Sequence, residues 1–315
     1  MEAALRNRLT FGPIMLTGLV LLLVLDHNFQ GMTRGWAESH FQMRSGIGGL
    51  GVLIILGLVL PLATREIGTL FAAERVRPYP VISALGSCAL VLHAFLTQFP
   101  PFKVVAASVL AFIVAFIPLL AALRRAMDRQ TQDAIVRMAG TVLASLYLGG
   151  LGWFLLAIRV KEGRGENGFR GTTAVLLMIL LMVKFTDIGA YFGGRALGRH
   201  KLIPWLSPGK TWEGLACGLA TAAGVGTLFA LTIPQLGLKP GQNGIPENWN
   251  WVRGLVFGVV IGGIGQAGDL LESMMKRDAE VKDSGKLVPG FGGVLDIIDS
   301  PLLAAPFAYL MFSLV

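Results

Sequence analysis

The sequence has few charged residues and almost no cysteine. Only 15% of its 315 residues are Asp, Glu, Lys or Arg, whereas a soluble domain carries roughly 25%, so an ordinary water-soluble protein is excluded. The two cysteines, Cys88 and Cys217, lie in apolar runs, which excludes a disulfide framework and predicts packing residues. The 41 glycines lack a collagen-like period. Pairs four residues apart, such as Gly214 and Gly218, predict close packing of membrane helices.

The sequence contains long apolar runs with few charged residues, and 54% of its residues are hydrophobic. A helix needs about 20 apolar residues to cross the hydrocarbon core of a bilayer, and nine segments qualify. They are residues 11–25, 46–63, 81–99, 104–123, 138–158, 172–194, 213–233, 253–271 and 292–315. We therefore expect an all-α, polytopic integral membrane protein with about nine transmembrane helices. No small-residue cleavage pattern follows the first run, so we expect it to be a retained anchor.

Basic residues are distributed unequally between the loops. The N-terminus and the even-numbered loops hold 17 of the 27 Lys and Arg residues, and the odd-numbered loops hold 9. Because cytosolic loops are enriched in Lys and Arg, we expect a cytosolic N-terminus and a non-cytosolic C-terminus. The fifth loop, with Arg159, Lys161, Arg164 and Arg170, opposes this trend. The net charge of +8 then reflects cytosolic loops that face anionic lipid and nucleotide, with no nucleic acid as a partner.

Ionisable residues inside or at the edges of the spans gather in the second half of the chain. Each costs at least ~2.5–3.5 kcal/mol at the bilayer centre, so a group of them indicates a polar functional site. They are Lys184, Asp187, Glu213, Asp269, Glu272, Asp296 and Asp299. This distribution predicts a scaffold of five helices over residues 1–171, with lipid access as a further role left open. It predicts catalytic helices over residues 172–315.

Helical spacing places several of these residues on one face. Residues three or four positions apart lie on the same side of a helix. One such face carries Asp269, Glu272, Ser273, Lys276 and Arg277. Asp296 and Asp299 are three residues apart at the start of the last span, and we expect them to point the same way. Carboxylates with no Cys or His near them in sequence suit Mg²⁺, and the adjacent cations suit a polyphosphate. The residues alone thus predict a metal-dependent phosphoryl or nucleotidyl transfer site.

Two loops beside these acids have patterns that suit anion binding. Ser207-Pro-Gly-Lys-Thr211 precedes an apolar run, so we expect backbone N–H groups, a hydroxyl and Lys210 to meet at a helix N-terminus. Residues 278–293 end in Pro-Gly-Phe-Gly-Gly, and we expect a re-entrant or tightly turned loop there. Its glycines allow backbone N–H groups to approach an oxyanion closely.

These motifs resemble those of a known family. The pattern Ser273-x2-Lys276-Arg277-x4-Lys282-Asp283-x5-Pro-Gly-Phe-Gly-Gly-x2-Asp296-x2-Asp299 is similar to the signature of the phosphatidate cytidylyltransferases, or CDP-diacylglycerol synthases. Asp187-Ile-Gly-Ala-Tyr-Phe-x-Gly-Arg195, followed by Ser207 to Gly214, resembles a second family motif. The resemblance is specific over residues 184–301. In the first half it is limited to the helix count, Glu66 and Arg77-Pro78.

The resemblance implies transfer of a cytidylyl group from CTP to phosphatidic acid, which gives CDP-diacylglycerol and pyrophosphate. It implies Mg²⁺ and, in some members, K⁺. By matching position, the implied metal ligands are Asp187, Asp269, Asp296 and Asp299. The implied catalytic residues are Asp269, Asp296, Lys276, Arg277 and Lys282. The implied substrate contacts are Arg195, Ser207, Lys210, Ser273, Asp283 and Gly292. The expected location is the inner (plasma) membrane, among membrane lipids, with the site facing the cytosol; a homodimer is left open.

Two positions depart from the family pattern and keep other interpretations open. Phe291 stands where the family usually has His, and Ile297 stands where it usually has Arg. Loss of a cation weakens phosphate binding by ~1.5–3 kcal/mol, which Arg277 or Lys286 is placed to offset. The alternatives are an enzyme that activates another phospholipid or isoprenoid phosphate, a catalytically weakened paralogue, and an ion-coupled transporter. A transporter usually shows related halves, which we do not find.

Overall fold

The computed structural model describes residues 2–43, 45–129, 131–161, 170–235, 245 and 248–314. This part of the chain is almost entirely helical, which confirms the prediction of an all-α membrane protein. Eight of its helical segments are long and apolar enough to span a membrane. The predicted span at residues 81–99 is present as a shorter apolar helix, α4 (Pro80–Leu96).

Contacts divide the chain into two compact units. Unit 1 comprises Met1–Val160 and Met275–Ile297, and unit 2 comprises Lys161–Met274 and Ile298–Val315. The boundary after Val160 falls close to the predicted division at residues 171 and 172. Residues 275–297 nevertheless group with the first part of the chain rather than with the helices that flank them. The division into a scaffold and a catalytic part stays a prediction.

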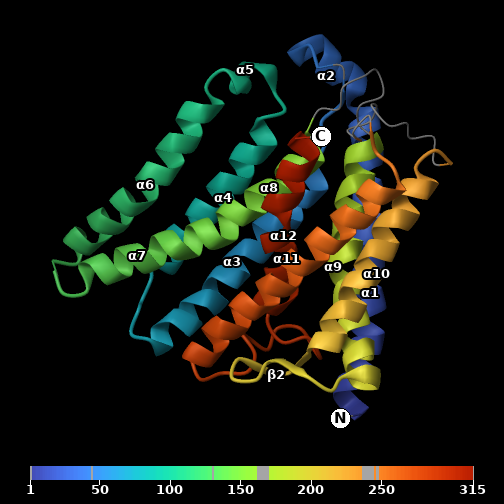
Figure 1. Ribbon diagram of the computed structural model, residues 1–315. Helices are drawn as coiled ribbons and strands as arrows, with labels where there is room; N and C mark the ends of the chain where they lie inside the picture. The colour runs from blue at the N-terminus through green and yellow to red at the C-terminus, as the bar shows by residue number, and fades with distance from the viewer. Residues whose placement is uncertain are drawn as a thin grey trace. The chain divides into compact units, whose positions relative to one another are not determined.

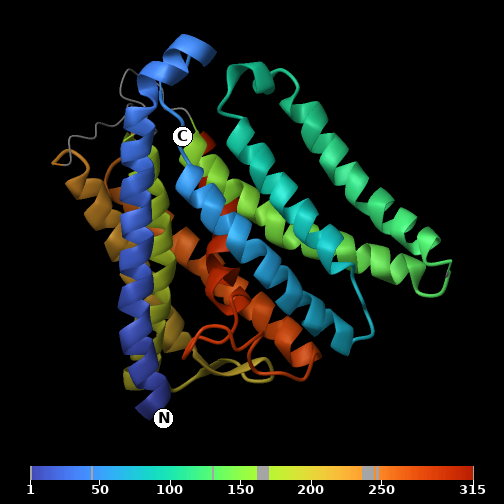
Figure 2. The same cartoon turned by 180° about the vertical axis from the view of Figure 1, so that it is seen from behind.

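Unit 1 is organised around α4, which packs against α3, α6, α7 and α8 (Figure 2). Figure 1 shows α6 and α7 as an antiparallel pair beside it. The elements are α1 (Glu2–Met32), α2 (Arg34–Phe41), α3 (Leu50–Ala73), α4, α5 (Pro100–Lys103), α6 (Ala106–Met127), α7 (Ala134–Ser145), the π-helix η1 (Leu146–Gly150) and α8 (Leu151–Val160). The last three are continuous and together form one apolar segment, Ala134–Val160, of spanning length.

A fully buried ion pair joins α1 to α8. Arg159 Nε lies 2.8 Å from Asp26 Oδ2, and both side chains are 0% exposed. The Asp26 carboxylate also accepts hydrogen bonds from the N–H groups of Gly49 and Gly51 at 3.1 and 2.9 Å, at the start of α3. The predicted span at residues 11–25 is part of a longer helix, α1, which runs on to Met32, and Asp26 lies on this helix with its partners inside the protein.

The same ion pair changes the count of basic residues in the fifth loop. Arg159 was assigned to that loop, but it lies on α8 and is buried. Without Arg159, the fifth loop holds three basic residues rather than four, so it opposes the predicted orientation less strongly. The rest of this loop, residues 162–169 with Arg164, lies outside the described residues.

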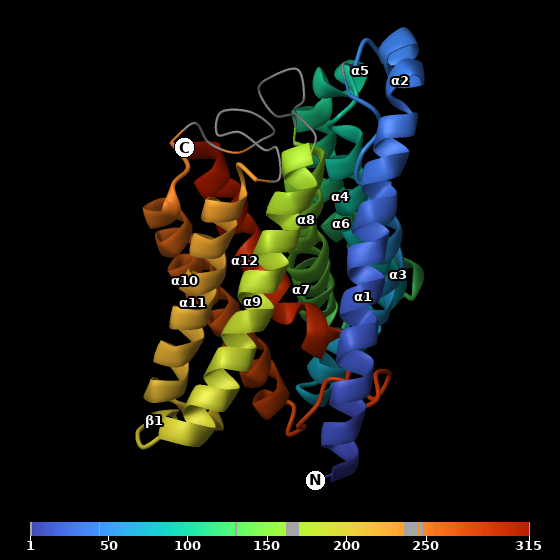
Figure 3. The same cartoon turned by 90° about the vertical axis from the view of Figure 1, so that its right-hand side faces the viewer.

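Unit 2 is built from α9 (Arg170–Leu197), α10 (Trp212–Thr232), most of α11 (Trp251–Asp278) and most of α12 (Leu295–Leu314). Helices α9 and α10 lie side by side (Figure 3), and small residues bring their backbones together. A Cβ atom on Gly218 of α10 would lie 2.7 Å from the Thr186 carbonyl oxygen of α9. Helix α11 comes at least as close to α10, because a Cβ on Gly226 would lie 2.0 Å from the Gly254 carbonyl oxygen. The close helix packing predicted from glycine spacing is therefore confirmed.

A small hairpin connects α9 to α10. Its strands, β1 (Lys201–Ile203) and β2 (Ser207–Thr211), pair antiparallel, with Lys201 opposite Thr211. Ser207–Thr211 directly precedes a helix, as predicted, and the segment itself is an extended strand; the anion site there stays a prediction. Helix α10 begins at Trp212 with its own cap, since Thr211 Oγ1 accepts a hydrogen bond from the Gly214 N–H at 3.1 Å.

Candidate active site

Three carboxylates of unit 2 come together from α11 and α12. Asp269 and Glu272 are one turn apart on α11, and Asp299 lies on α12. One oxygen of each lies within 4.8 Å of the others, and we call these three residues the acidic group. Glu272 and Asp299 are 1% and 3% exposed. A donor set made only of carboxylate oxygens, clustered in this way, fits a hard cation such as Mg²⁺.

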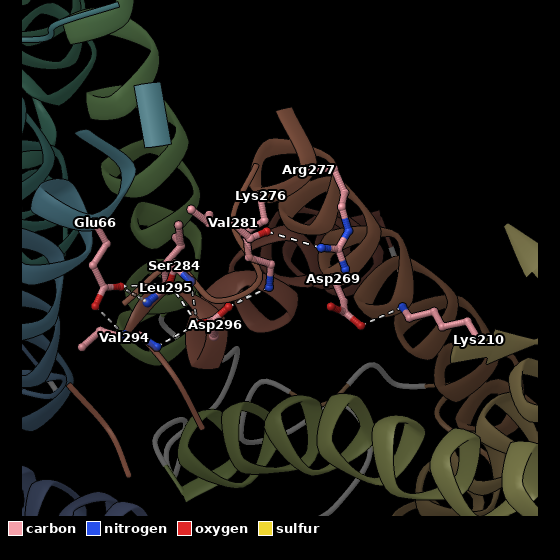
Figure 4. Close-up of polar contacts among 11 residues, drawn as sticks. Glu66, Lys210, Asp269, Lys276, Arg277, Val281, Ser284, Val294, Leu295 and Asp296 are labelled. Carbon is pink, nitrogen blue, oxygen red and sulfur yellow. Dashed lines mark hydrogen bonds and ion pairs between the residues drawn. The ribbon is translucent and has the colours of Figure 1, made fainter. Parts of the chain in front are cut away.

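A series of polar contacts links the hairpin to the acidic group. Lys210 Nζ, from β2, lies 2.7 Å from Asp269 Oδ2 (Figure 4) and donates a hydrogen bond to Gln266 Oε1 at 3.1 Å. Gln266 Nε2 donates to Asp187 Oδ1 at 2.8 Å. Asp187 Oδ2 lies 3.9 Å from Lys184 Nζ on the same helix. Lys210 therefore adds a positive charge directly beside Asp269.

The acidic group differs from the four ligands that the family resemblance implies. It contains Asp269 and Asp299, and it adds Glu272, which lies on the predicted helix face but was not among the predicted ligands. Asp187 is outside the group, and Gln266 bridges it to Lys210, which contacts Asp269. The spacing of Glu272, three residues after Asp269, was a usable signal. Gln266 carries no charge, so the sequence gave no signal for its role.

Asp296 lies in unit 1, where the loop before α12 holds its carboxylate. Oδ2 accepts hydrogen bonds from the Ser284 N–H at 3.1 Å, the Ser284 hydroxyl at 3.0 Å and the Gly293 N–H at 2.7 Å. Oδ1 accepts a hydrogen bond from Lys276 Nζ at 2.7 Å, and the Lys276 and Asp296 side chains are only 12% and 8% exposed. The structure thus ties two predicted catalytic residues into one ion pair. Their catalytic and metal-binding roles stay predictions.

Glu66 of α3 binds the same loop where it joins the start of α12 (Figure 4). Its buried carboxylate accepts hydrogen bonds from the N–H groups of Val294 and Leu295 at 2.9 and 2.8 Å. The Ser284 hydroxyl lies 3.2 Å from Glu66 Oε2. The first N–H groups of a helix have no partners within the helix, so Glu66 supplies acceptors at the start of α12. The sequence marked Glu66 only through the family resemblance.

The Pro-Gly-Phe-Gly-Gly segment is tightly turned, as predicted. The Val288 N–H donates to the Gly292 carbonyl at 2.9 Å, and the Gly292 N–H donates to the Val288 carbonyl at 3.0 Å. Gly290 and Gly292 have φ angles of 85° and 99°, which favour glycine. A Cβ on Gly292 would also lie 2.5 Å from Asp296 Oδ2. Gly292 therefore has a structural reason to be glycine, and its predicted substrate contact stays a prediction.

The other residues that were predicted to bind substrate or to act in catalysis lie near helix ends, in a strand and in loops. In unit 2, Arg195 is exposed near the end of α9, with Nη1 3.5 Å from the Tyr191 hydroxyl. Ser207 opens β2, and Ser273 is half-buried on α11, one turn beyond Asp269. The remaining three are exposed in unit 1: Arg277, Lys282 and Asp283. Each position is open to solvent or half-buried, which is compatible with contact to a bound substrate.

Comparison with known proteins identifies the family. Residues 32–315 match the model of the cytidylyltransferase family, and the chain belongs to this family. A phosphatidate cytidylyltransferase of Synechocystis is 31% identical over 284 residues, which cover 84% of this chain and 88% of the relative.

Two further relatives align over a shorter region. Phosphatidate cytidylyltransferases of Brucella suis and Bacillus subtilis are 41% identical over 171 residues and 36% identical over 172 residues. These regions cover 54% and 55% of this chain, and the chain spans little more than half of each relative, 56% and 57%.

Proposed function

We propose that the protein is a CTP:phosphatidate cytidylyltransferase that forms CDP-diacylglycerol and pyrophosphate for phospholipid biosynthesis. The observation that carries this proposal is the acidic group with Lys210 at 2.7 Å from Asp269. Membership of the cytidylyltransferase family and the names of its relatives support it. The hydrophobic helices that end beside these residues suit a lipid substrate.

In the proposed reaction, a phosphate oxygen of phosphatidate attacks the α-phosphorus of CTP. The bond between that phosphorus and the oxygen bridging to the β-phosphate breaks, and pyrophosphate leaves. Asp269, Glu272 and Asp299 would hold Mg²⁺, which neutralises charge on the phosphates in reactions of this kind. Lys210 adds a cation beside Asp269, and Ser273 offers a hydroxyl one turn further along α11. The attacking phosphate is already ionised, so the reaction needs no strong general base.

The location and the further cofactor are parts of the same proposal. The excess of basic residues in the even-numbered loops supports a site that faces the cytosol. The bacterial sources of the relatives support an inner membrane. A K⁺ ion beside Mg²⁺ rests on the family resemblance alone, and a homodimer is left open.

A second candidate is an enzyme of the same chemistry with another lipid acceptor, and Phe291 favours it. This half-buried ring replaces the usual His on the turn that precedes Asp296. Its Cζ atom is 3.5 Å from the position that a Cβ on Gly12 would take. The ring thus puts apolar surface, in place of a polar group, on the loop that carries the family signature.

The acceptor can be determined directly. Purified protein in phosphatidylcholine vesicles is given Mg²⁺ and tritiated CTP with phosphatidate, lysophosphatidate or a polyisoprenyl phosphate. We expect lipid-extractable label with phosphatidate. Label only with the isoprenoid phosphate would select the second candidate. No product with any acceptor, from protein with an unchanged helical circular dichroism spectrum, would contradict both and leave the weakened paralogue or the transporter.

A further inference from the structure

The hairpin between α9 and α10 displays a large aromatic side chain at its tip. Trp205 is 77% exposed, while its neighbour Leu206 is buried and donates its N–H to the Ile203 carbonyl at 3.2 Å. The turn is therefore folded against its own strands and still leaves the indole outside. In a membrane protein, an exposed tryptophan beside the ends of two spans is typical of the level of the lipid headgroups.

The charge around this tip is strongly positive. Between Asp187 and Glu213 the chain contains four Lys and Arg residues and no acidic residue. Lys210 faces Asp269, but Arg199 and Lys201 are exposed. Lys201 Nζ donates to the Pro208 carbonyl at 2.8 Å, and an ammonium group has two further protons to donate. We call Arg199, Lys201 and Trp205 the hairpin surface.

The hairpin is fixed to the start of α10. His200 Nδ1 lies 2.6 Å from Glu213 Oε1, and the Arg199 N–H donates to Glu213 Oε2 at 3.1 Å. The Trp212 N–H donates to the His200 carbonyl at 3.0 Å. Glu213, the nearest acid in sequence, is thus occupied by the hairpin's own backbone and His200. The hairpin surface is held in one place relative to the helix.

Its position identifies the partner. The apolar segments Thr173–Leu197 and Trp212–Thr232 end on either side of the hairpin (Figure 3), so it lies where the hydrocarbon core meets water. Tryptophan prefers the headgroup level of a bilayer, and basic residues are attracted to anionic lipid there. A soluble polyphosphate would bind to the cations alone and would make no use of the exposed indole of Trp205.

We propose that the hairpin surface binds anionic phospholipid headgroups. Trp205 lies at headgroup depth, and Arg199 and Lys201 hold the lipid phosphates. This surface is separate from the proposed reaction, and its test needs neither CTP nor turnover.

The test follows the depth of residue 205 in the full-length protein. Trp205→Cys, in a background with Cys88→Ala and Cys217→Ala, carries an environment-sensitive fluorophore. The protein is reconstituted in phosphatidylcholine vesicles with increasing phosphatidylglycerol, and a neutral aqueous quencher reports exposure of the probe. Arg199→Gln/Lys201→Gln removes the cations. Arg124→Gln/Arg129→Gln removes two exposed cations from another loop on the same predicted side.

We expect phosphatidylglycerol to shift the emission to the blue and to shield the probe. The phosphatidylglycerol content that gives half of the emission shift should rise about fivefold for each hairpin cation lost and about 25-fold for both. It should not change in the control pair. A probe equally open to the quencher in both kinds of vesicle would overturn the proposal. So would a hairpin double variant that behaves like the control pair at unchanged helical content. Either result leaves the proposed reaction untouched.

Discussion

Glu66 and Asp296 are both within hydrogen-bonding distance of the Ser284 hydroxyl, at 3.2 and 3.0 Å. A hydroxyl has one proton to donate, so it serves one of these carboxylates at a time. Backbone N–H groups hold each carboxylate as well, those of Val294 and Leu295 on Glu66 and those of Ser284 and Gly293 on Asp296. The loop before α12 is thus fixed by two acids from distant parts of the sequence.

Replacing Glu66 with Gln should destabilise the protein. A carboxylate accepts at both oxygens, but an amide presents its NH₂ group to one of the two backbone N–H donors of Val294 and Leu295 and leaves that donor unpaired. The expected loss is about 1–3 kcal/mol of unfolding free energy, measured by denaturant unfolding in detergent micelles. Glu74→Gln is the control, because Glu74 is exposed just beyond the end of α3. Equal stability of the two variants would contradict this account of Glu66.

The Lys276–Asp296 pair should show strong coupling. Lys276→Met alone leaves a mostly buried carboxylate without its cation, which costs about 3–5 kcal/mol. Lys276→Met/Asp296→Asn removes both charges and should cost less than the sum of the single changes. A double-mutant cycle on unfolding free energies measures the difference. Additive single effects would show that the 2.7 Å contact contributes no coupling.

The acidic group should determine the requirement for Mg²⁺. Asp269→Asn, Glu272→Gln and Asp299→Asn should each raise the Mg²⁺ concentration for half-maximal activity by about tenfold or more, a loss of about 1.4 kcal/mol of binding free energy. Binding of Mn²⁺, followed by electron paramagnetic resonance, gives a readout without turnover. Asp278→Asn, an exposed acid at the end of α11, is the control.

Glu272→Gln is the decisive variant of this series. Glu272 belongs to the group that the structure assembles but not to the set that the resemblance implied. Mn²⁺ affinity unchanged by Glu272→Gln but lost in Asp187→Asn would favour the predicted set over the acidic group.

Helix packing in unit 2 should depend on particular glycines. A Cβ on Gly258 would lie 2.3 Å from the Ala222 carbonyl oxygen, so Gly258→Ala forces α10 and α11 apart and should cost about 1–3 kcal/mol. Nothing lies within 4 Å of a Cβ on Gly224 of α10, so Gly224→Ala should be neutral or slightly stabilising. Thermal unfolding in one detergent compares the two. A Gly258→Ala protein as stable as Gly224→Ala would show that this close approach is absent.

Local patterns in the sequence were sufficient for the spans and for the helix that carries Asp269 and Glu272. Hydropathy and a spacing of three or four residues depend only on neighbours along the chain. The tight turn before Asp296 was predictable for the same reason, because glycine and proline act locally.

Contacts between distant residues were not predictable in this way. Glu66 and Val294 are 228 positions apart, and nothing near either residue indicates the other. Asp26 and Arg159 looked like residues at the ends of spans until their pairing placed both in the core. The strand Ser207–Thr211 was not predicted, because it is formed by pairing with Lys201–Ile203.

The most direct test of the proposed reaction follows the two ends of the CTP triphosphate. Vesicles containing the protein, phosphatidate and Mg²⁺ receive CTP labelled at either the α- or the γ-phosphate. We expect α-label in extractable lipid and γ-label in aqueous pyrophosphate, with both products lost in Asp269→Asn and kept in Asp278→Asn. Wild-type protein that leaves the α-label in water, or Asp269→Asn protein that still transfers it at the wild-type rate, would contradict the account.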